Sequence, residues 1–358
     1  MKLATTTGDF MIHTRDQFEA IDYIAQSGFK YIDYNFGMDL RSKSGVFSDD
    51  CKGYVEKLKN FVESKGLNLV QSHAPMGQPF VDGEAFIDVN KRCIEACAML
   101  GIDNTVVHSG HLKGISTKEE SFEKNKEFYN KLLPFAEQHG VYVLTENFNK
   151  MFDPNWFWAD DAQTVLELVE YIDHPMLKVC WDTGHGNMKD IPQHESLKLL
   201  GKYVHALHVQ DNWSDGDHHI APFFGTMNLD SLMHGLKEIG YNGYFTFEAD
   251  AMFMPPHRRR PFEEDKRLLC VPLEIMIKGE NLLYEIGKYT LKAYDCFEEK
   301  IKGLGKITKS LCVYKFNMSL IKGVMASPMD AKPKSVGWQL STVPSNPAFS
   351  ISTVPLMM

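Results

Sequence analysis

Four short apolar runs of the sequence each end on a side chain that can ligate a metal ion: Glu146, Asp182, His208 and Glu248. Glu146 or Asp182 alone could equally cap the helix that follows it. If all four converge, however, their carboxylates repel one another unless a cation lies between them. Three carboxylates and one imidazole form a donor set rich in oxygen, which favours Mn²⁺, Mg²⁺ or Co²⁺ over a thiolate-rich zinc site. The sequence therefore predicts one divalent metal ion, with Zn²⁺ as a further candidate.

Further imidazoles and acids occur at equivalent points of the chain. They are His73, His108, His185, Asp217 and His219. His73 and His108 end two earlier apolar runs, and the other three follow runs that carry the metal-ligating candidates. A lone histidine in such a position is about as often a hydrogen-bonded structural residue as a ligand. Their joint occurrence predicts that they belong to the same site.

The elements that must position these residues repeat one unit: a short apolar strand, a polar loop and an amphipathic helix that often ends at a glycine. The predicted strands span Lys2–Thr7, Tyr31–Phe36, Leu67–His73, Thr105–His108, Val141–Asn147, Leu177–Asp182, His205–Val209 and Tyr244–Glu248. The predicted helices span Thr14–Ser27, Tyr54–Ser64, Val89–Leu100, Glu119–Gln138, Asp161–Ile172, Glu195–Tyr203, Leu229–Ile239 and about Pro272 to Lys302. Eight such units favour an α/β fold of the (β/α)₈ TIM barrel type over a doubly wound sheet, and no Gly-x-Gly-x-x-Gly follows the first strand. In a TIM barrel the carboxyl ends of all strands meet at one face, so the candidate residues would converge there.

The repeat stops at Gly303, which divides the chain into a barrel of residues 1–302 and a tail of residues 303–358. The tail is rich in Ser, Pro, Lys and Met without a sustained period, so we expect it to be disordered or loosely attached. Its six lysines and one acid leave a charge of −14 on residues 1–302, because the whole chain carries −9. A barrel with this negative charge repels polyphosphates, which argues against nucleic acid as a partner.

The composition of the chain indicates the cellular compartment of the protein and some of its partners. No apolar run approaches the roughly 18 residues that cross a bilayer, and the first residues lack a stretch of signal-peptide length. The seven cysteines form no metal-type pairs and no even-numbered disulfide framework. We therefore expect a cytoplasmic protein with reduced thiols and no membrane partner. The sequence leaves open whether copies of the chain form a homo-oligomer.

In this order and spacing, the motifs resemble those of the xylose-isomerase-like TIM barrel superfamily of sugar and sugar-phosphate isomerases and epimerases. The segments that carry the resemblance are Thr145-Glu146-Asn147, Trp181-Asp182-Thr183-Gly184-His185, His208-Val209-Gln210-Asp211-Asn212, Asp217-His218-His219 with Pro222 through Gly225-Thr226, and Phe247-Glu248. The resemblance covers roughly residues 1–302. It implies an isomerase of carbohydrate metabolism that acts on a small sugar or sugar phosphate, without identifying which one.

The reaction that the resemblance implies is a proton transfer at a carbon next to a carbonyl group. A metal bound to the substrate's oxygens would stabilise the enediolate, and Glu146 and Glu248 would act as general bases and acids on opposite faces of the substrate. Return of the proton to the same carbon gives epimerisation, and transfer to the adjacent carbon gives isomerisation. Asp182 and His208 would only hold the metal, and His185 would bind a substrate hydroxyl.

Further substrate contacts are implied around this centre. Such roles are expected for His73, His108, Asp217 and His219. Trp181 would line the pocket or belong to the core, and Arg258, the first of three consecutive arginines, would bind a substrate phosphate unless the run is a solvated loop. Aromatic residues after the fifth strand would stack on the sugar or form a small core under the loop; they are Phe148, Phe152, Trp156, Phe157 and Trp158.

Two other functions remain open at this point. The superfamily includes zinc apurinic endonucleases, and nine residues fall where a trinuclear phosphodiesterase site would draw its ligands: His73, His108, Glu146, Asp182, His185, His208, Asp217, His219 and Glu248. The negative charge of residues 1–302 and the lack of interleaved basic and aromatic residues favour the isomerase over the endonuclease. A non-catalytic barrel that binds a ligand would be expected to have lost metal ligands, whereas here all four are present.

Overall fold

The structure is a computed structural model that describes residues 1–42, 44–148, 157, 159–253, 255, 258–265 and 267–297. These residues belong to the first of two units of the chain, Met1–Lys300, and the second is Ile301–Met358. The predicted tail therefore lies outside the described residues, as do Phe152, Trp156 and Trp158.

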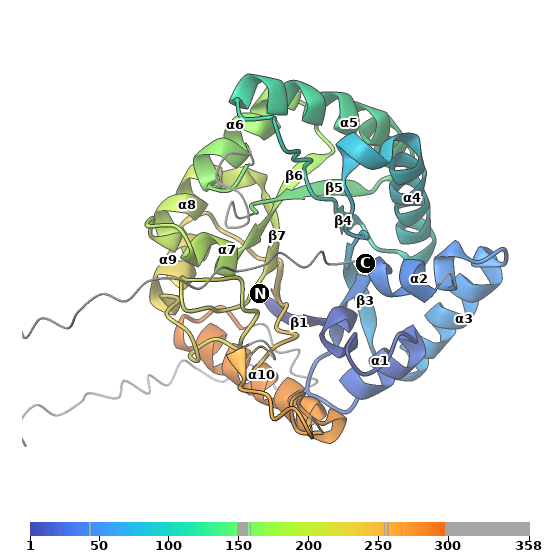
Figure 1. Cartoon of the computed structure of the whole chain (residues 1–358), viewed down its shortest axis with the longest axis vertical. Coiled ribbons are helices and arrows are strands. Elements are labelled where there is room, and N and C mark those ends of the chain that lie inside the picture. The colour runs from blue at the N-terminus through green and yellow to red at the C-terminus, as the bar shows by residue number, and fades with distance from the viewer. Residues whose placement is uncertain are drawn as a thin grey trace, which may run out of the picture. The chain divides into compact units, whose positions relative to one another are not determined.

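Eight parallel strands form one sheet in which consecutive strands are neighbours (Figure 1). They are β1 (Lys2–Thr6), β2 (Tyr31–Asn35), β3 (Asn68–His73), β4 (Asn104–Val106), β5 (Tyr142–Glu146), β6 (Leu177–Asp182), β7 (Val204–His208) and β8 (Tyr244–Phe247). The sheet closes just beyond β7, where Val209 forms a parallel bridge with Phe247. There the Val209 N–H donates to the Thr246 carbonyl (2.7 Å) and the Glu248 N–H donates to the Val209 carbonyl (3.2 Å). The predicted (β/α)₈ barrel is confirmed.

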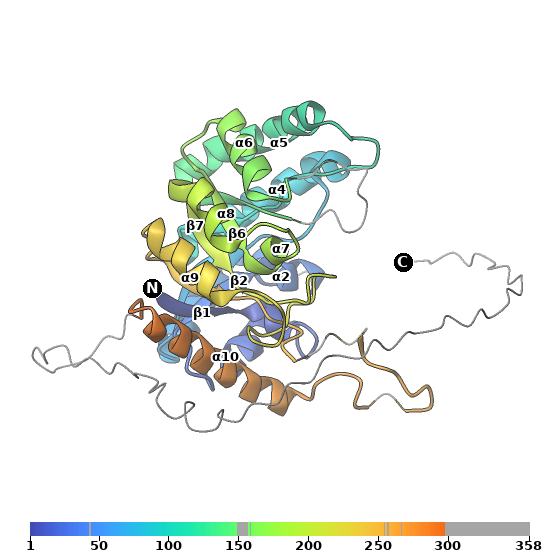
Figure 2. The ribbon, with the colours of Figure 1, turned by 90° about the vertical axis from the view of Figure 1, so that its left-hand side faces the viewer.

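Helices follow the strands and surround the sheet (Figures 1 and 2). They are α1 (Gln17–Ile24), α2 (Phe36–Ser42), α3 (Cys51–Ser64), α4 (Pro79–Leu100), α5 (Lys118–His139), α6 (Ala162–Ile172), α7 (Thr183–Asn187), α8 (Gln193–Leu200), α9 (Leu229–Glu238) and α10 (Leu273–Ala293), with short 3₁₀ turns η1 (Thr7–Phe10), η2 (Gly45–Phe47) and η3 (Gly201–Tyr203). Side-chain caps begin several of them, as where Asp161 accepts the Thr164 N–H at the start of α6. In the described part of the chain, no helix is long and apolar enough to cross a membrane.

Several helix boundaries differ from those predicted. Helix α4 begins at Pro79 rather than Val89, because Gly83, with φ of 57°, kinks its first turns and interrupts the apolar period. The short helices α2 and α7 were not predicted, since five to seven residues are too few to show a helical period. Both follow strand ends directly and carry polar residues of the cavity described below.

The core lies in two places. The larger part fills the space between the sheet and the helices and includes Trp181, Phe245 and Phe247, all buried. A small cluster inside the barrel is formed by Val106, Leu144, Cys180 and Ala206. Alternate residues of one strand thus face the helices and the barrel interior, as the two-residue period of a strand requires.

Helix α10 packs against β1 and buries two carboxyl groups. Glu280 on α10 and Asp9 in η1 are fully buried, and Thr5 Oγ1 donates to Glu280 Oε2 (3.0 Å). Asp9 Oδ1 accepts the Ala249 N–H (3.1 Å). The two carboxyl groups affect each other's ionisation, and two buried like charges so close together favour the state in which one of them is protonated. Burial raises the pKa of Glu280 to about 7, and burial together with the charge of Glu280 raises the pKa of Asp9 well above its usual value.

This buried pair makes stability depend on pH. A carboxyl whose pKa rises from 4.5 to about 7 on folding favours the folded state below pH 4.5 and loses that contribution as the pH rises through 7. We therefore expect the difference in unfolding free energy between Glu280→Gln and the wild type to shift in favour of the variant as the pH rises from 5 to 8. The shift should be on the order of 1–3 kcal/mol. Urea denaturation at both pH values measures the difference, and an equal difference at the two would contradict this account.

Candidate metal centre and active site

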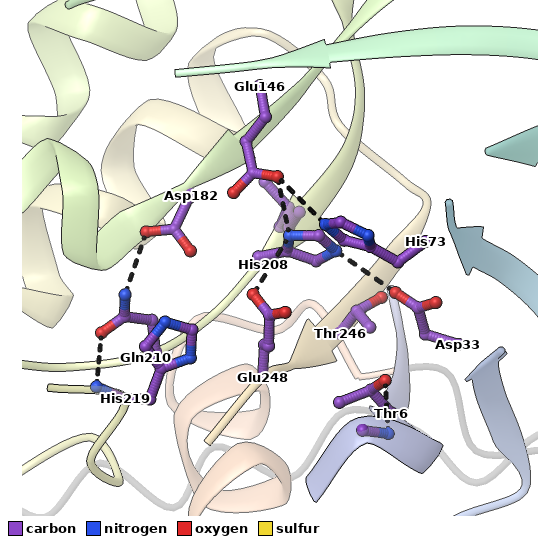
Figure 3. A network of polar contacts seen from close by, with 12 residues as sticks. Thr6, Asp33, His73, Glu146, Asp182, His208, Gln210, His219, Thr246 and Glu248 are labelled. Atoms are coloured by element: carbon purple, nitrogen blue, oxygen red, sulfur yellow. Dashed lines mark hydrogen bonds and ion pairs between the residues drawn. The ribbon is translucent and has the colours of Figure 1, made fainter. Parts of the chain in front are cut away.

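The ends of β5, β6, β7 and β8 bring the four predicted metal-ligating side chains together (Figure 3). His208 Nδ1 lies 3.3 Å from Glu146 Oε2 and 3.3 Å from Glu248 Oε2, and Figure 3 shows the two glutamates on opposite sides of the imidazole. Asp182 completes the group, in which one ligand atom of each residue lies within 4.8 Å of the others. Glu146, Asp182 and His208 are buried, whereas the Glu248 side chain is 19% exposed.

Two atoms of this group have the environment of cation ligands. In the described part of the chain, the buried Oδ2 of Asp182 accepts no hydrogen bond, and Nδ1 of His208 makes none although it faces two carboxylates. A buried carboxylate oxygen without a partner is unfavourable, and a divalent cation would satisfy it. Three carboxylates and one imidazole suit a hard or borderline divalent ion. The residues present therefore fit the predicted metal.

The two glutamates differ in their tendency to ionise. Burial opposes ionisation of Glu146, but the charges of His208 and His108 outweigh it and hold the pKa of Glu146 well below its usual value. For Glu248, burial is the larger effect and raises the pKa, although His208 and His219 act against it. Without a cation, the group therefore depends on the histidines to neutralise its carboxylates.

Asp33 supports this group from within the barrel and was not predicted. Its Oδ2 accepts from His208 Nε2 (3.2 Å) and from Gln71 Nε2 (2.8 Å). The bond to Asp33 orients the imidazole and directs Nδ1 toward the glutamates, as carboxylate partners of ligating histidines do. The available signal was an acid in the middle of the apolar strand Tyr31–Asn35, on the opposite side from the buried Ile32.

His73 and His108 lie beside Glu146. His108 Nε2 is 2.9 Å from Glu146 Oε2 and 3.1 Å from His73 Nε2. His73 Nδ1 donates to the Ala74 carbonyl (2.6 Å), so its Nε2 carries a lone pair, which faces His108 Nε2. The structure thus places both predicted histidines within reach of a ligand bound at Glu146.

His185, Asp217 and His219 form a second group next to Asp182. His185 Nε2 lies 3.1 Å from Asp217 Oδ2, and His219 Nε2 lies 3.3 Å from Asp217 Oδ1. Burial raises the pKa of Asp217, whereas the charges of His219 and His185 lower it. The effect of the two histidines is the larger, so the pKa of Asp217 lies well below its usual value. His185 lies on α7 rather than on the predicted loop, because Asp182 Oδ1 accepts the His185 N–H (2.6 Å) and caps that helix.

The glycine between Asp182 and His185 has a packing reason. A Cβ on Gly184 would overlap the side-chain amide of Gln210. That amide donates to Asp182 Oδ1 (3.3 Å) and to Asp217 Oδ1 (2.8 Å). Glycine at this position therefore lets one amide link the two acidic groups.

Two predicted substrate contacts are placed elsewhere. Trp181 is 1% exposed, faces the helices, and donates its indole N–H to Gln193 Oε1 (2.7 Å). It belongs to the core, which is one of the two placements expected for it, and it does not line the cavity. Arg258 is exposed and also does not line the cavity; its guanidinium pairs with Asp215 (2.9 Å) and lies over the Trp213 ring. This placement agrees with the solvated loop that was the alternative for the arginine run, and it gives no support to a phosphate contact of Arg258 in the cavity.

A cavity of about 340 Å³ opens above the candidate ligands, a size suited to a small molecule. Its described lining is Thr6, Gly8, Asp9, Met11, Asn35, Gly37, Leu40, Arg41, His73, Ala74, Pro75, Met76, His108, Glu146, Phe148, His185, Asp217, His219, Glu248 and Asp250. Phe148 packs against the rings of His108 (5.0 Å between centroids) and His185 (4.7 Å). Of the predicted aromatic residues of that loop, Phe148 is thus placed as an apolar wall of the cavity, and Phe157 packs instead with Phe122.

The role of Asp33 can be tested through metal affinity. We expect Asp33→Asn to weaken Mn²⁺ or Co²⁺ binding about 10- to 100-fold, because the amide orients His208 less firmly than a carboxylate does. Isothermal titration of the metal into chelator-treated protein measures the change. Asp88→Asn, at an exposed residue of α4, is the matched control. Unchanged affinity in Asp33→Asn, with the fold intact by circular dichroism, would contradict this role.

Comparisons with known proteins agree with this architecture. The family model described as a xylose isomerase-like TIM barrel matches residues 21–269. The uncharacterized protein MJ1311 of Methanocaldococcus jannaschii is 27% identical over 168 residues, which cover 45% of this chain and 56% of that protein. Fructoselysine 3-epimerase of Shigella flexneri is 24% identical over 186 residues, 51% of this chain and 66% of the enzyme. Both alignments thus span less than two thirds of the relative.

A solved structure extends the match to almost a whole barrel. A D-tagatose 3-epimerase-like protein superposes with a TM-score of 0.64 at 19% identity, covering 82% of this chain and 98% of that chain. At this identity the likeness establishes the fold. Together with the family match over most of the barrel, it leads to one conclusion: the chain belongs to the xylose isomerase-like TIM barrel family.

Proposed function

We propose that this chain is a divalent-metal-dependent isomerase or epimerase of a sugar or sugar phosphate, which moves a proton on a carbon next to a carbonyl group. The names of its relatives support this class, since they include fructoselysine 3-epimerase and a D-tagatose 3-epimerase-like protein. The volume of the cavity and the polar residues that line it support a small polar substrate.

The observation that carries the proposal is the placement of two carboxylates about one point. Glu146 and Glu248 reach His208 Nδ1 from opposite sides, each at 3.3 Å, and both line the cavity. A substrate carbon held between them would have a carboxylate on each face. One glutamate would remove the proton from one face and the other would deliver a proton to the opposite face, which inverts that carbon.

The cation would be held by Glu146, Asp182, His208 and Glu248, whose donor atoms fit one divalent ion. When bound, such an ion supplies Lewis acidity toward the oxygens of the substrate. Asn147 fixes the position of Asp182, because its side-chain Oδ1 accepts the Asp182 N–H (2.8 Å) and its Nδ2 donates to the Asp182 carbonyl (2.9 Å). The donor set is therefore held in place before any ligand binds.

Other residues of the cavity would orient the substrate. The Nδ1 atoms of His73 and His185 contact the Ala74 and Asn147 carbonyls, while His73 Nε2 lies 3.1 Å from His108 Nε2 and His185 Nε2 lies 3.1 Å from Asp217 Oδ2. A substrate hydroxyl would therefore meet each imidazole at Nε2, where it would share or replace the present contact. Phe148 covers the histidines on one side and excludes water from that wall.

The two glutamates can be tested by isotope exchange. We expect Glu146→Gln and Glu248→Gln each to lower the exchange of solvent deuterium into ketoses by at least about 100-fold, because an amide cannot take up the proton. Mass spectrometry of D-fructose, D-tagatose and D-psicose incubated in D₂O with the Mn²⁺-loaded protein measures this exchange.

Glu238→Gln, at an exposed residue of α9, is the matched control and should exchange as the wild type does. Full exchange in Glu248→Gln would remove Glu248 from the mechanism. Absence of exchange in the wild type with any sugar or sugar phosphate would favour a non-catalytic binding barrel.

A second candidate function, phosphodiester hydrolysis at a trinuclear zinc site, is favoured by one observation. The nine residues named for it form neighbouring groups: His73 and His108 beside Glu146, the four predicted metal ligands, and His185 with Asp217 and His219. Such a set could hold more than one ion. Nicking of a DNA duplex with an abasic site by the Zn²⁺-loaded protein, without exchange on any ketose, would replace the isomerase proposal.

A further inference from the structure

The mouth of the cavity carries one strongly basic side chain in an acidic surrounding. Among the described residues that line the cavity, Arg41 is the single lysine or arginine, whereas five carboxyl groups line it: Asp9, Glu146, Asp217, Glu248 and Asp250. Arg41 lies in the last turn of α2, directly after β2, and is exposed, whereas Glu146 at the floor is buried. The cavity thus has a buried acidic floor and a cationic point at its entrance.

The guanidinium of Arg41 has no acidic partner in the described part of the chain. Its Nη1 donates to the thioether sulfur of Met11 (2.9 Å), which is a weak acceptor. The neighbouring lining is apolar, with Leu40, Pro75 and Met76, and the Met76 side chain is 57% exposed. A guanidinium has five N–H donors in a planar fork, so most of them are available to a ligand that enters the cavity.

These contacts distinguish Arg41 from the arginine that the sequence indicated. Arg258 is neutralised by Asp215 and stands over Trp213, outside the cavity lining. A phosphate or carboxylate in the cavity would therefore meet Arg41 and not Arg258. The carboxylates of the lining would repel such an anion, and Arg41 is the single lysine or arginine of the described lining that would attract it.

We propose that Arg41 binds an anionic group, a phosphate or a carboxylate, at the end of the substrate remote from the reacting carbon. The substrate class would then be a phosphorylated or acidic ketose rather than a neutral one. This inference rests on the proposed function, since the floor of the same cavity takes the carbonyl end. A planar guanidinium matches two oxygens of either group, which gives selectivity over a neutral hydroxymethyl end.

Binding tests this inference separately from turnover. Isothermal titration of D-fructose 6-phosphate, D-fructose and D-gluconate into the Mn²⁺-loaded protein compares an anionic with a neutral end on similar carbon chains. We expect the phosphate or the carboxylate to bind at least about tenfold more tightly than D-fructose, because a hydrogen bond to a charged group is stronger than one to a neutral group. Arg41→Ala should abolish this preference, and Arg41→Lys should restore part of it. Arg15→Ala, at an exposed arginine outside the cavity lining, should keep it.

The outcomes separate the two claims. Deuterium exchange into neutral ketoses with no preference for an anionic end would overturn the role of Arg41 and leave the proposed function standing. An anion preference that depends on Arg41, without exchange into any ketose, would support the anion site and contradict the isomerase. A preference that is lost in Arg258→Ala and retained in Arg41→Ala would overturn this assignment.

Discussion

The site depends on three carboxylates, two of them buried and one partly buried, that surround one imidazole at the open end of the barrel. Like charges at this separation cannot all remain ionised in a buried place unless a positive charge lies among them. The protein supplies part of that charge through histidines that contact Glu146 and Asp217. The unpaired Oδ2 of Asp182 shows that the histidines do not satisfy every oxygen. A divalent cation would complete the balance with atoms that are already in place.

The barrel fold makes it possible to hold these mutually repelling carboxylates close together. Each ligand stands at the end of a different strand, so its position is fixed by backbone hydrogen bonds to two neighbours. The closing contact between Val209 and Phe247 brings β8, and with it Glu248, beside β7 and His208. Asp33 and Gln210 then fix the side chains through hydrogen bonds from the interior and from the rim. Opening that contact would separate the two glutamates, and so closure and function are linked.

The sequence predicted those features that a regular period marks. Strand ends could be located because the apolar period of each strand stops at a polar residue, and the TIM barrel places these ends together. The side chains of Glu146, Asp182, His208 and Glu248 were therefore found without a structure. The same period decides between the two placements expected for Trp181, because Cys180 and Asp182 face the interior and their neighbour must face the helices.

Other features depend on contacts that no local pattern marks. Asp33 acquires its role because the register of β2 and β3 places it beside Gln71 and across the interior from His208. Arg41 lies on a helix of seven residues, too short for a period, and lines the cavity only because α2 follows β2 directly. The run of three arginines suggested a phosphate contact at Arg258, but Arg258 pairs with Asp215 and lies outside the described cavity lining.

The central claim, that the four ligands hold one divalent cation, is tested most directly by metal content. Elemental analysis of protein purified without chelator, before and after addition of Mn²⁺, Mg²⁺, Co²⁺ or Zn²⁺ and gel filtration, gives the number of ions per chain. We predict about one ion per chain, lost in Asp182→Asn and His208→Asn. Two or three tightly held zinc ions, or no binding after every metal has been added, would contradict it.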